Sequence, residues 1–253
     1  MGNVMIFSFG RGRSDQGRVG GQRTSRGFTL VELLVVISII ALLLSLLVPT
    51  LSRSRELTKQ AACLSNLSQL NRAWMSYAIA YRGYVMRAFT GTGYWALSGN
   101  TRETITGGIL YRFTNSVEVY RCPADTSDHY RTYSASDYIG GNNWVPAPWN
   151  YVSVLELGKI QYPHETMILL EENDPRGYNG GSWVVYPGGD NWIDFSVSWH
   201  LGGANFCFAD GHVEHWEWQD PRTPKIDWFY QSTPGNPDLA RIQQAYIPQY
   251  VKP

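Results

Sequence analysis

The chain has 253 residues, enough for one globular domain with an appendage or for two small domains. Its formal net charge is zero, but residues 1–27 carry a net positive charge, so the remainder is mildly acidic and offers no basic patch for nucleic acid. Charged residues are few at 17% and aromatic residues many at 14%. This composition favours a β-rich extracytoplasmic domain over a helical cytosolic one, although an aromatic core alone would also account for it.

Residues 28–48 form an apolar stretch of 21 residues, about 30 Å of helix and about one hydrocarbon thickness. In an ordinary secretory signal peptide the small residue at the cleavage site follows the apolar stretch, whereas Gly27 precedes it. Cleavage after Gly27 would therefore remove only the polar leader and keep the helix. The arginines of the leader predict that the N-terminal end is cytoplasmic and that the body lies outside the cytoplasmic membrane.

Glu32 is the one formal charge in this apolar stretch. A carboxylate inside a membrane span costs several kcal/mol unless it is paired, which makes Glu32 a functional candidate; the alternative is a glutamate that snorkels to the interface. The order of basic leader, Gly27, Phe28, Glu32 and apolar helix resembles the type IV prepilin and pseudopilin signal. The alternative is an uncleaved membrane anchor with a chance Gly-Phe pair.

The resemblance implies that a prepilin peptidase cleaves after Gly27 and that Phe28 becomes an N-methylated N-terminus. It also implies that Glu32 meets the new N-terminal amine of a neighbouring subunit. Many pilins have a proline near the position of Pro49, which closes the apolar run here. A proline inside a helix removes a backbone donor, so we expect a bend or a melted turn at this residue.

Residues 50–82 have the pattern of an amphipathic helix with one face packed on a domain, and Gly83 is a plausible stop. The face predicted to be buried consists of Leu57, Ala61, Leu64, Asn71, Trp74, Ala78 and Tyr81.

Residues 83–253 contain short β-prone runs separated by Gly, Pro, Asn and Asp. The predicted strands are 117–121, 166–170, 183–186, 196–199, 205–209 and 213–218, with a short helix at 237–246. The predicted fold is α+β and pilin-like, a long N-terminal helix packed on a small antiparallel sheet. The predicted divisions are a cleaved leader (1–27), a transmembrane and assembly helix (28–49), an amphipathic helix (50–82) and a β-rich extracytoplasmic domain (83–253).

A second motif consists of His200, nine further residues, and Asp210-Gly211. It resembles the processing-associated C-terminal signature of many prepilin-like proteins, and the segments around Cys63 and Cys122 also look like that group. Asp-Gly is a favoured turn pair, and a second tight turn is expected at Gly202-Gly203. We expect His200 and Asp210 to lie at one end of a hairpin and to hydrogen-bond.

Two alternatives would place a metal in this domain. His200, Asp210, His212 and His215 offer nitrogen and oxygen ligands for a transition metal, although their spacing matches no recognised zinc pattern. Major type II secretion pseudopilins can bind calcium in this region, and an acidic loop could do so here, although it lacks an EF-hand pattern. That loop consists of Glu171, Glu172, Asn173 and Asp174. The simpler interpretation is a solvated loop after a buried strand.

The three cysteines contain no Cys-x-x-Cys pair. Cys63 lies on the predicted helix and Cys122 just after a predicted strand, so a disulfide between them would join helix and sheet, worth typically about 2–4 kcal/mol. We expect Cys207 to be free in a buried strand.

The resulting hypothesis is a non-catalytic structural subunit, a pseudopilin or minor pilin of a type II secretion pseudopilus or a type IV pilus-like filament. Its expected partners are prepilin peptidase, other pilin or pseudopilin subunits and an inner-membrane assembly platform, with no nucleic acid and no cofactor other than the calcium alternative. We expect a single-pass protein of the bacterial cytoplasmic membrane with a periplasmic or extracellular body. The alternatives are a glycan-binding or other ligand-binding module on a pilin stalk, and a membrane-tethered metal-dependent enzyme using His200, Asp210 and His212.

Overall fold

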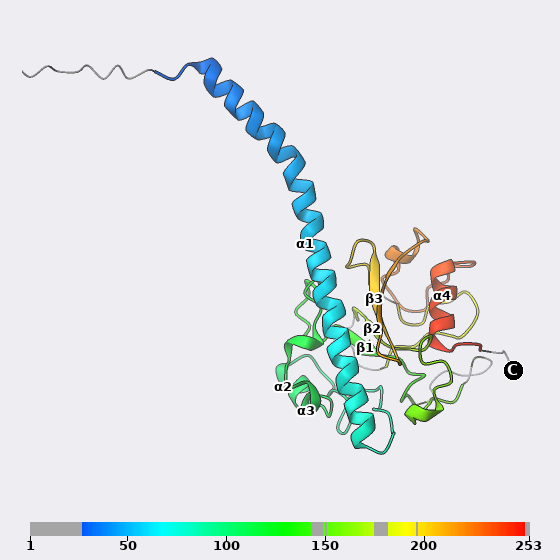
Figure 1. Ribbon diagram of the computed structural model, residues 1–253. Helices are drawn as coiled ribbons and strands as arrows, with labels where there is room; N and C mark the ends of the chain where they lie inside the picture. Colours follow the sequence, from blue (N-terminus) through cyan, green and yellow to red (C-terminus); the bar gives the residue numbers. More distant parts are fainter. Residues whose placement is uncertain (1–26, 143–148, 150, 175–181, 196, 251–253) are drawn as a thin grey trace, which may run out of the picture. The chain divides into compact units, whose positions relative to one another are not determined.

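The computed structural model describes residues 27–142, 149, 151–174, 182–195 and 197–250 (Figure 1). The chain divides after Val48 into an N-terminal part and a compact C-terminal part that begins at Pro49. Of the predicted leader, residues 1–27, all but Gly27 lie outside the described residues.

Helix α1 (Leu30–Ala80) is 51 residues long and begins in the N-terminal part. Its most apolar 18-residue window has a mean hydropathy of 3.0 and no buried residue. By length and composition α1 can cross a membrane, as predicted. The helix continues through Pro49 without a break, so the turn does not melt there. Helix α1 ends at Ala80, just before the predicted stop at Gly83. Arg82 (φ +57°) and Gly83 (φ +87°) then turn the chain away, and the Gly83 N–H donates to the Ala78 carbonyl.

The C-terminal part of α1 packs against the domain along one face, as the amphipathic pattern predicts. Its buried residues are Cys63, Leu67, Leu70, Asn71, Ala73, Trp74 and Ala78. The predicted face was therefore right at Asn71, Trp74 and Ala78. It was wrong at Leu57, Ala61 and Tyr81, which are exposed, and it missed Cys63 and Leu67, which are buried.

The sheet has four antiparallel strands in the order β1-β2-β3-β4. These are β1 (Tyr133–Ala135), β2 (Met167–Glu171), β3 (Gly203–Phe208) and β4 (Val213–Glu217). The last three confirm the strands predicted at 166–170, 205–209 and 213–218, while β1 was missed. Residues 117–121 contain a 3₁₀ turn, η1 (Glu118–Tyr120), and 183–186 contain only a bridge to Ser136. Of the strand predicted at 196–199, residue 196 lies outside the described residues and 197–199 form no strand.

Two cores cover the two faces of the sheet. The helix-side core joins Leu67, Leu70 and Trp74 of α1 to Leu169 of β2 and Cys207 of β3. The far-side core joins alternate strand residues to α4 (Pro237–Tyr246), the helix predicted at 237–246. Its members include Met167, Leu170, Phe206, Phe208, Leu239, Ile242 and Tyr246. In Figure 1 the sheet accordingly lies between residues 50–80 of α1 and helix α4.

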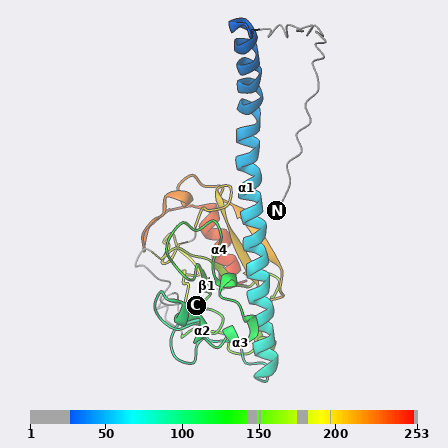
Figure 2. The ribbon, with the colours of Figure 1, turned by 90° about the vertical axis from the view of Figure 1, so that its left-hand side faces the viewer.

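The remaining elements are short. Helices α2 (Arg102–Thr106) and α3 (Tyr111–Thr114) lie beside the end of α1, as both Figure 1 and Figure 2 show. The 3₁₀ turns η2 (Leu157–Lys159) and η3 (Thr223–Lys225) complete the set. A long N-terminal helix followed by a small antiparallel sheet confirms the predicted α+β, pilin-like fold class.

Candidate functional site

The first turn of α1 is closed by a capping box between Thr29 and Glu32. The Thr29 backbone N–H and hydroxyl each donate to Glu32 Oε2 at 2.8 Å, and the Glu32 N–H donates to Thr29 Oγ1 at 3.2 Å. These contacts hold the Glu32 carboxylate at the start of α1, against the backbone N–H of the Phe28–Thr29 peptide. The prediction for Glu32 did not include Thr29, although the Thr-x-x-Glu spacing is the sequence signature of this cap.

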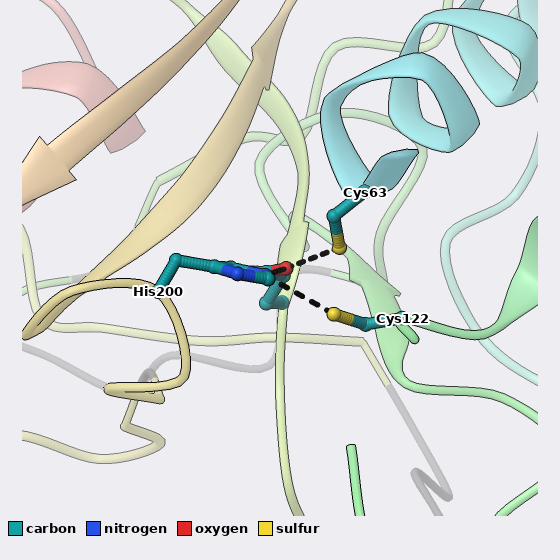
Figure 3. Close-up of side chains that lie close together, drawn as sticks. Cys63, Cys122 and His200 are labelled. Atoms are coloured by element: carbon teal, nitrogen blue, oxygen red, sulfur yellow. Dashed lines mark hydrogen bonds and ion pairs between the residues drawn. The ribbon is translucent and has the colours of Figure 1, made fainter. Parts of the chain in front are cut away.

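A second cluster lies inside the C-terminal part, where four segments distant in sequence meet (Figure 3). Cys63 comes from α1, Cys122 from the turn after η1, Glu171 from the end of β2, and His200 from the segment just before β3. All four are fully buried, and one ligand atom from each lies within 4.8 Å of the others. We call these four residues the thiol–imidazole cluster.

The contacts inside the cluster centre on the Glu171 carboxylate. Its Oε1 accepts from the Cys63 thiol at 2.5 Å and lies 2.9 Å from His200 Nε2. His200 Nε2 also lies 3.1 Å from Cys122 Sγ. Both thiols therefore approach the same carboxylate–imidazole pair.

A ring of polar groups holds the cluster in place. Tyr133 Oη lies 2.8 Å from Cys63 Sγ. The Asn205 backbone N–H donates to Glu171 Oε2 at 2.8 Å and its side-chain amide to Oε1 at 3.3 Å. The Asn205 amide oxygen lies 3.0 Å from His215 Nδ1. These contacts fix the positions of the Cys63 thiol and of both Glu171 carboxylate oxygens.

A two-residue turn orients His200. Leu201 and Gly202 have φ of +49° and +82°, and they close a bridge in which the Gly203 N–H donates to the His200 carbonyl at 2.9 Å. The predicted turn at Gly202-Gly203 is therefore displaced by one residue, and Gly203 is the first residue of β3.

The electrostatics of the cluster follow from burial and from these contacts. Burial, assisted by Cys122 and Glu171, raises the pKa of the Cys63 thiol, whereas the neighbouring Cys63 thiol and His200 imidazole lower the pKa of Cys122. Burial alone would lower the pKa of His200, but contacts with Cys122 and Glu171 outweigh it and raise that pKa to about 9. Cys122 is therefore the thiol of the pair that ionises first.

The structure separates the ligand sets predicted from sequence. His200 faces Glu171 and Cys122, not Asp210, so the predicted His200–Asp210 hydrogen bond is absent. Asp210 instead lies 2.6 Å from His212 Nδ1 on the exposed β3–β4 turn, where Gly211 has φ +103°. His200, Asp210 and His212 therefore do not form one site.

The acidic segment after β2 is buried rather than solvated, contrary to the simpler interpretation of the sequence. Glu171 joins the thiol–imidazole cluster, while Glu172 accepts a hydrogen bond from the Ser134 hydroxyl. Burial and the Asp194 charge raise the pKa of Glu172 to about 8. Asp174 is also buried and Asn173 is exposed, and the group of potential metal ligands found among the described residues joins Glu171 to Cys63, Cys122 and His200 and not to Glu172 or Asp174.

All three cysteines are free thiols in the structure, so the predicted Cys63–Cys122 disulfide is not formed. Cys207 is free in buried strand β3, as expected, and accepts from the Asn71 amide at 3.2 Å. All four members of the thiol–imidazole cluster are candidate residues in the sequence, but in three different roles.

Comparison with known proteins identifies the N-terminal segment. Residues 22–48 match the family model of the prokaryotic N-terminal methylation motif. No curated protein and no solved structure shows a significant match to this chain. The match contains Gly27, Phe28 and Glu32 and the apolar start of α1. Residues 22–48 therefore give this chain the N-terminal segment characteristic of type IV prepilin-like proteins.

Proposed function

We propose that this protein is a structural, non-catalytic subunit of a type II secretion pseudopilus or a type IV pilus-like filament. The observation that carries the proposal is the methylation motif at residues 22–48, which leads directly into the apolar part of α1. A prepilin peptidase removes residues 1–27 and methylates the new N-terminus at Phe28. The leader stays cytoplasmic, α1 spans the inner membrane once, and the body lies outside.

The apolar part of α1 supports assembly because its large hydrophobic side chains are exposed. The large hydrophobic residues of 30–48 are all exposed, by between 44% and 82%. A surface of this size requires lipid or neighbouring helices as its surroundings. Other pilin-like subunits and an inner-membrane assembly platform would supply these neighbours.

Glu32 links processing to assembly in this proposal. Cleavage after Gly27 creates an amine four residues before Glu32, and the capping contacts with Thr29 hold the carboxylate at the same end of the helix. The amine of an adjacent subunit pairs with that carboxylate, which offsets the cost of a charge in the membrane. An uncleaved chain lacks this amine.

The aromatic residues give less support to a glycan-binding function. Trp74, Trp95, Trp183 and Trp192 are fully buried, so they serve the cores. Among the described tryptophans Trp228 alone is exposed, at 56%. The high aromatic content is thus largely explained by packing.

Processing is tested by co-expressing the chain with an active prepilin peptidase and measuring the N-terminus of the product by mass spectrometry. The expected product starts at N-methylated Phe28. Gly27→Leu should leave the leader attached, and Gly21→Leu, just outside the matched motif, should not. A wild-type chain that keeps its leader beside a cleaved control prepilin would refute the proposal.

Assembly is tested by cross-linking membrane copies of the processed protein through cysteines placed in residues 33–47. Glu32→Gln should reduce cross-linking by about tenfold, equivalent to ~1.4 kcal/mol, while cleavage continues. Glu56→Gln is the matched control, since Glu56 pairs with Lys59 beyond the apolar segment. Equal cross-linking in both variants would remove the role proposed for Glu32.

A further inference from the structure

We propose that Cys63, Cys122, Glu171 and His200 bind one divalent metal ion of the sulfur- and nitrogen-preferring class, with zinc as its typical member. The proposal concerns the C-terminal part alone and does not depend on leader cleavage. In this proposal His200, Cys63 and Cys122 bind the same ion, whereas the sequence suggested a turn motif for His200 and a disulfide for the two cysteines.

The donor set is of the right kind and number. Two sulfurs, one imidazole nitrogen and one carboxylate oxygen are four donors, the usual coordination number of structural zinc. Thiolate and imidazole together select zinc-like ions over calcium or magnesium, which prefer oxygen alone. The predicted calcium loop does not provide this chemistry.

The spacing is also right. Zinc–ligand bonds of about 2.0–2.3 Å in a tetrahedron place neighbouring donor atoms about 3.2–3.8 Å apart. Here Cys63 Sγ and Glu171 Oε1 are 2.5 Å apart, and no two of the four donor atoms are more than 4.8 Å apart. Side-chain adjustments of roughly 1 Å or less bring the four donors into the tetrahedral range.

Burial argues for an ion that these groups share. Four ionisable side chains with no solvent exposure are expensive to bury unless their charges are compensated. A divalent cation compensates two thiolates directly, and on binding the two thiol protons and the proton on His200 Nε2 pass to solvent. The hydrogen bonds from Asn205 to Glu171 and the hydroxyl of Tyr133 beside Cys63 stabilise the remaining negative charge.

His200 is oriented for ligation through Nε2. This atom points at Glu171 and Cys122, while the buried Nδ1 has no hydrogen-bond partner among the described residues. Nδ1 can therefore keep the ring proton while Nε2 donates its lone pair to the metal. The Leu201-Gly202 turn fixes the imidazole in this direction.

The site has four protein donors and no solvent-exposed member, which is the pattern of a structural rather than a catalytic centre. Its ion would tie α1 to β2 and to the segments around Cys122 and His200. This replaces the predicted disulfide with a metal cross-link between the same two cysteines.

The test is metal analysis of the full-length protein, purified in detergent with a thiol reductant and dialysed against zinc at a slight excess. We expect about one zinc per chain for the wild type and less than about 0.1 for His200→Gln and Cys122→Ser. Cys207→Ser is the matched control, because Cys207 is also buried and free but contacts Asn71 instead. His212→Ala controls for binding by the exposed Asp210–His212 pair.

Cobalt substitution provides a second measurement that needs no variant to fold. Co²⁺ in the wild-type site should give the intense visible bands of tetrahedral coordination together with sulfur-to-cobalt charge transfer, and zinc should abolish both. Absence of stoichiometric metal, a cobalt spectrum without sulfur bands, or loss of metal in His212→Ala but not in His200→Gln would each overturn the proposal. So would a Cys63–Cys122 disulfide, found by peptide mapping of protein exported in cells.

Discussion

Replacing Gly203 by alanine should destabilise the domain strongly, because the new methyl group has no room. A Cβ at this position would lie 2.0 Å from the Trp216 carbonyl oxygen and 2.8 Å from His215 Cε1, whereas ordinary contacts are 3.4–4 Å. The first obstacle is backbone, so no side-chain rotation can relieve it. Strands β3 and β4 must separate by more than about 1 Å at the start of their pairing, which also disturbs the turn that orients His200.

Overpacking of this kind typically costs about 1–3 kcal/mol, and a backbone clash belongs at or above the upper end of that range. For a folded part of this size, about 3 kcal/mol corresponds to a fall in Tm of roughly 6–12 °C. Equilibrium urea unfolding and thermal unfolding, both followed by tryptophan fluorescence, measure this directly.

Alanine substitutions at two other glycines provide a comparison for the loss of stability in Gly203→Ala. Gly202 has open space around its Cβ position but φ +82°, so Gly202→Ala should cost only the left-handed backbone strain of about 1–2 kcal/mol. Gly158 has open space and no positive φ, so Gly158→Ala should change stability by less than about 0.5 kcal/mol. If Gly203→Ala is no more destabilising than Gly202→Ala, the steric argument is wrong.

Three further predictions concern the cores, the last helix and the buried carboxylates. Leu67→Ala should cost about 2–5 kcal/mol of unfolding free energy and Leu57→Ala, at a site that is 48% exposed, less than about 1 kcal/mol, in the same urea assay. Asn236 accepts two backbone N–H bonds at the start of α4, so Asn236→Ala should cost about 1 kcal/mol, and an unchanged urea midpoint would contradict this cap. Burial raises the pKa of Glu172 from 4.5 to about 8, so the folded state keeps a proton that the unfolded state releases, and stability should fall as pH rises across that interval. In Glu172→Gln the urea midpoint should fall less steeply between pH 5 and pH 8 than in the wild type. An equally steep fall in both proteins would show that other groups cause the pH dependence.

Local signals in the sequence predicted the elements that local forces determine. The apolar run predicted the course of α1 and Gly83 closely predicted its end, and the short helix predicted at 237–246 is α4. The strand predicted at 205–209 was also right, and because successive side chains of a strand alternate, Phe206 and Phe208 enter the far-side core while Cys207 enters the helix-side core.

The errors arose where long-range packing decides the structure. Strand β1 has only three residues, all buried, and exists because β2 provides its partner. The run at 117–121 is β-prone in composition but folds as a 3₁₀ turn that presents Cys122 to the thiol–imidazole cluster. No spacing rule brings residues 63, 122, 171 and 200 together, because their proximity depends on the complete tertiary fold.

Strand β4 ends the sheet, so its outer backbone groups face no further strand among the described residues. A free edge is a hazard for a protein held at high density, because a neighbouring copy can add a strand to it. Here the edge strand is short and carries Glu214, His215 and Glu217. Copies that approach through this edge bring like charges together, which disfavours sheet-to-sheet aggregation. In the proposed filament, contact between copies would therefore run through the apolar part of α1 and not through the edge of the sheet.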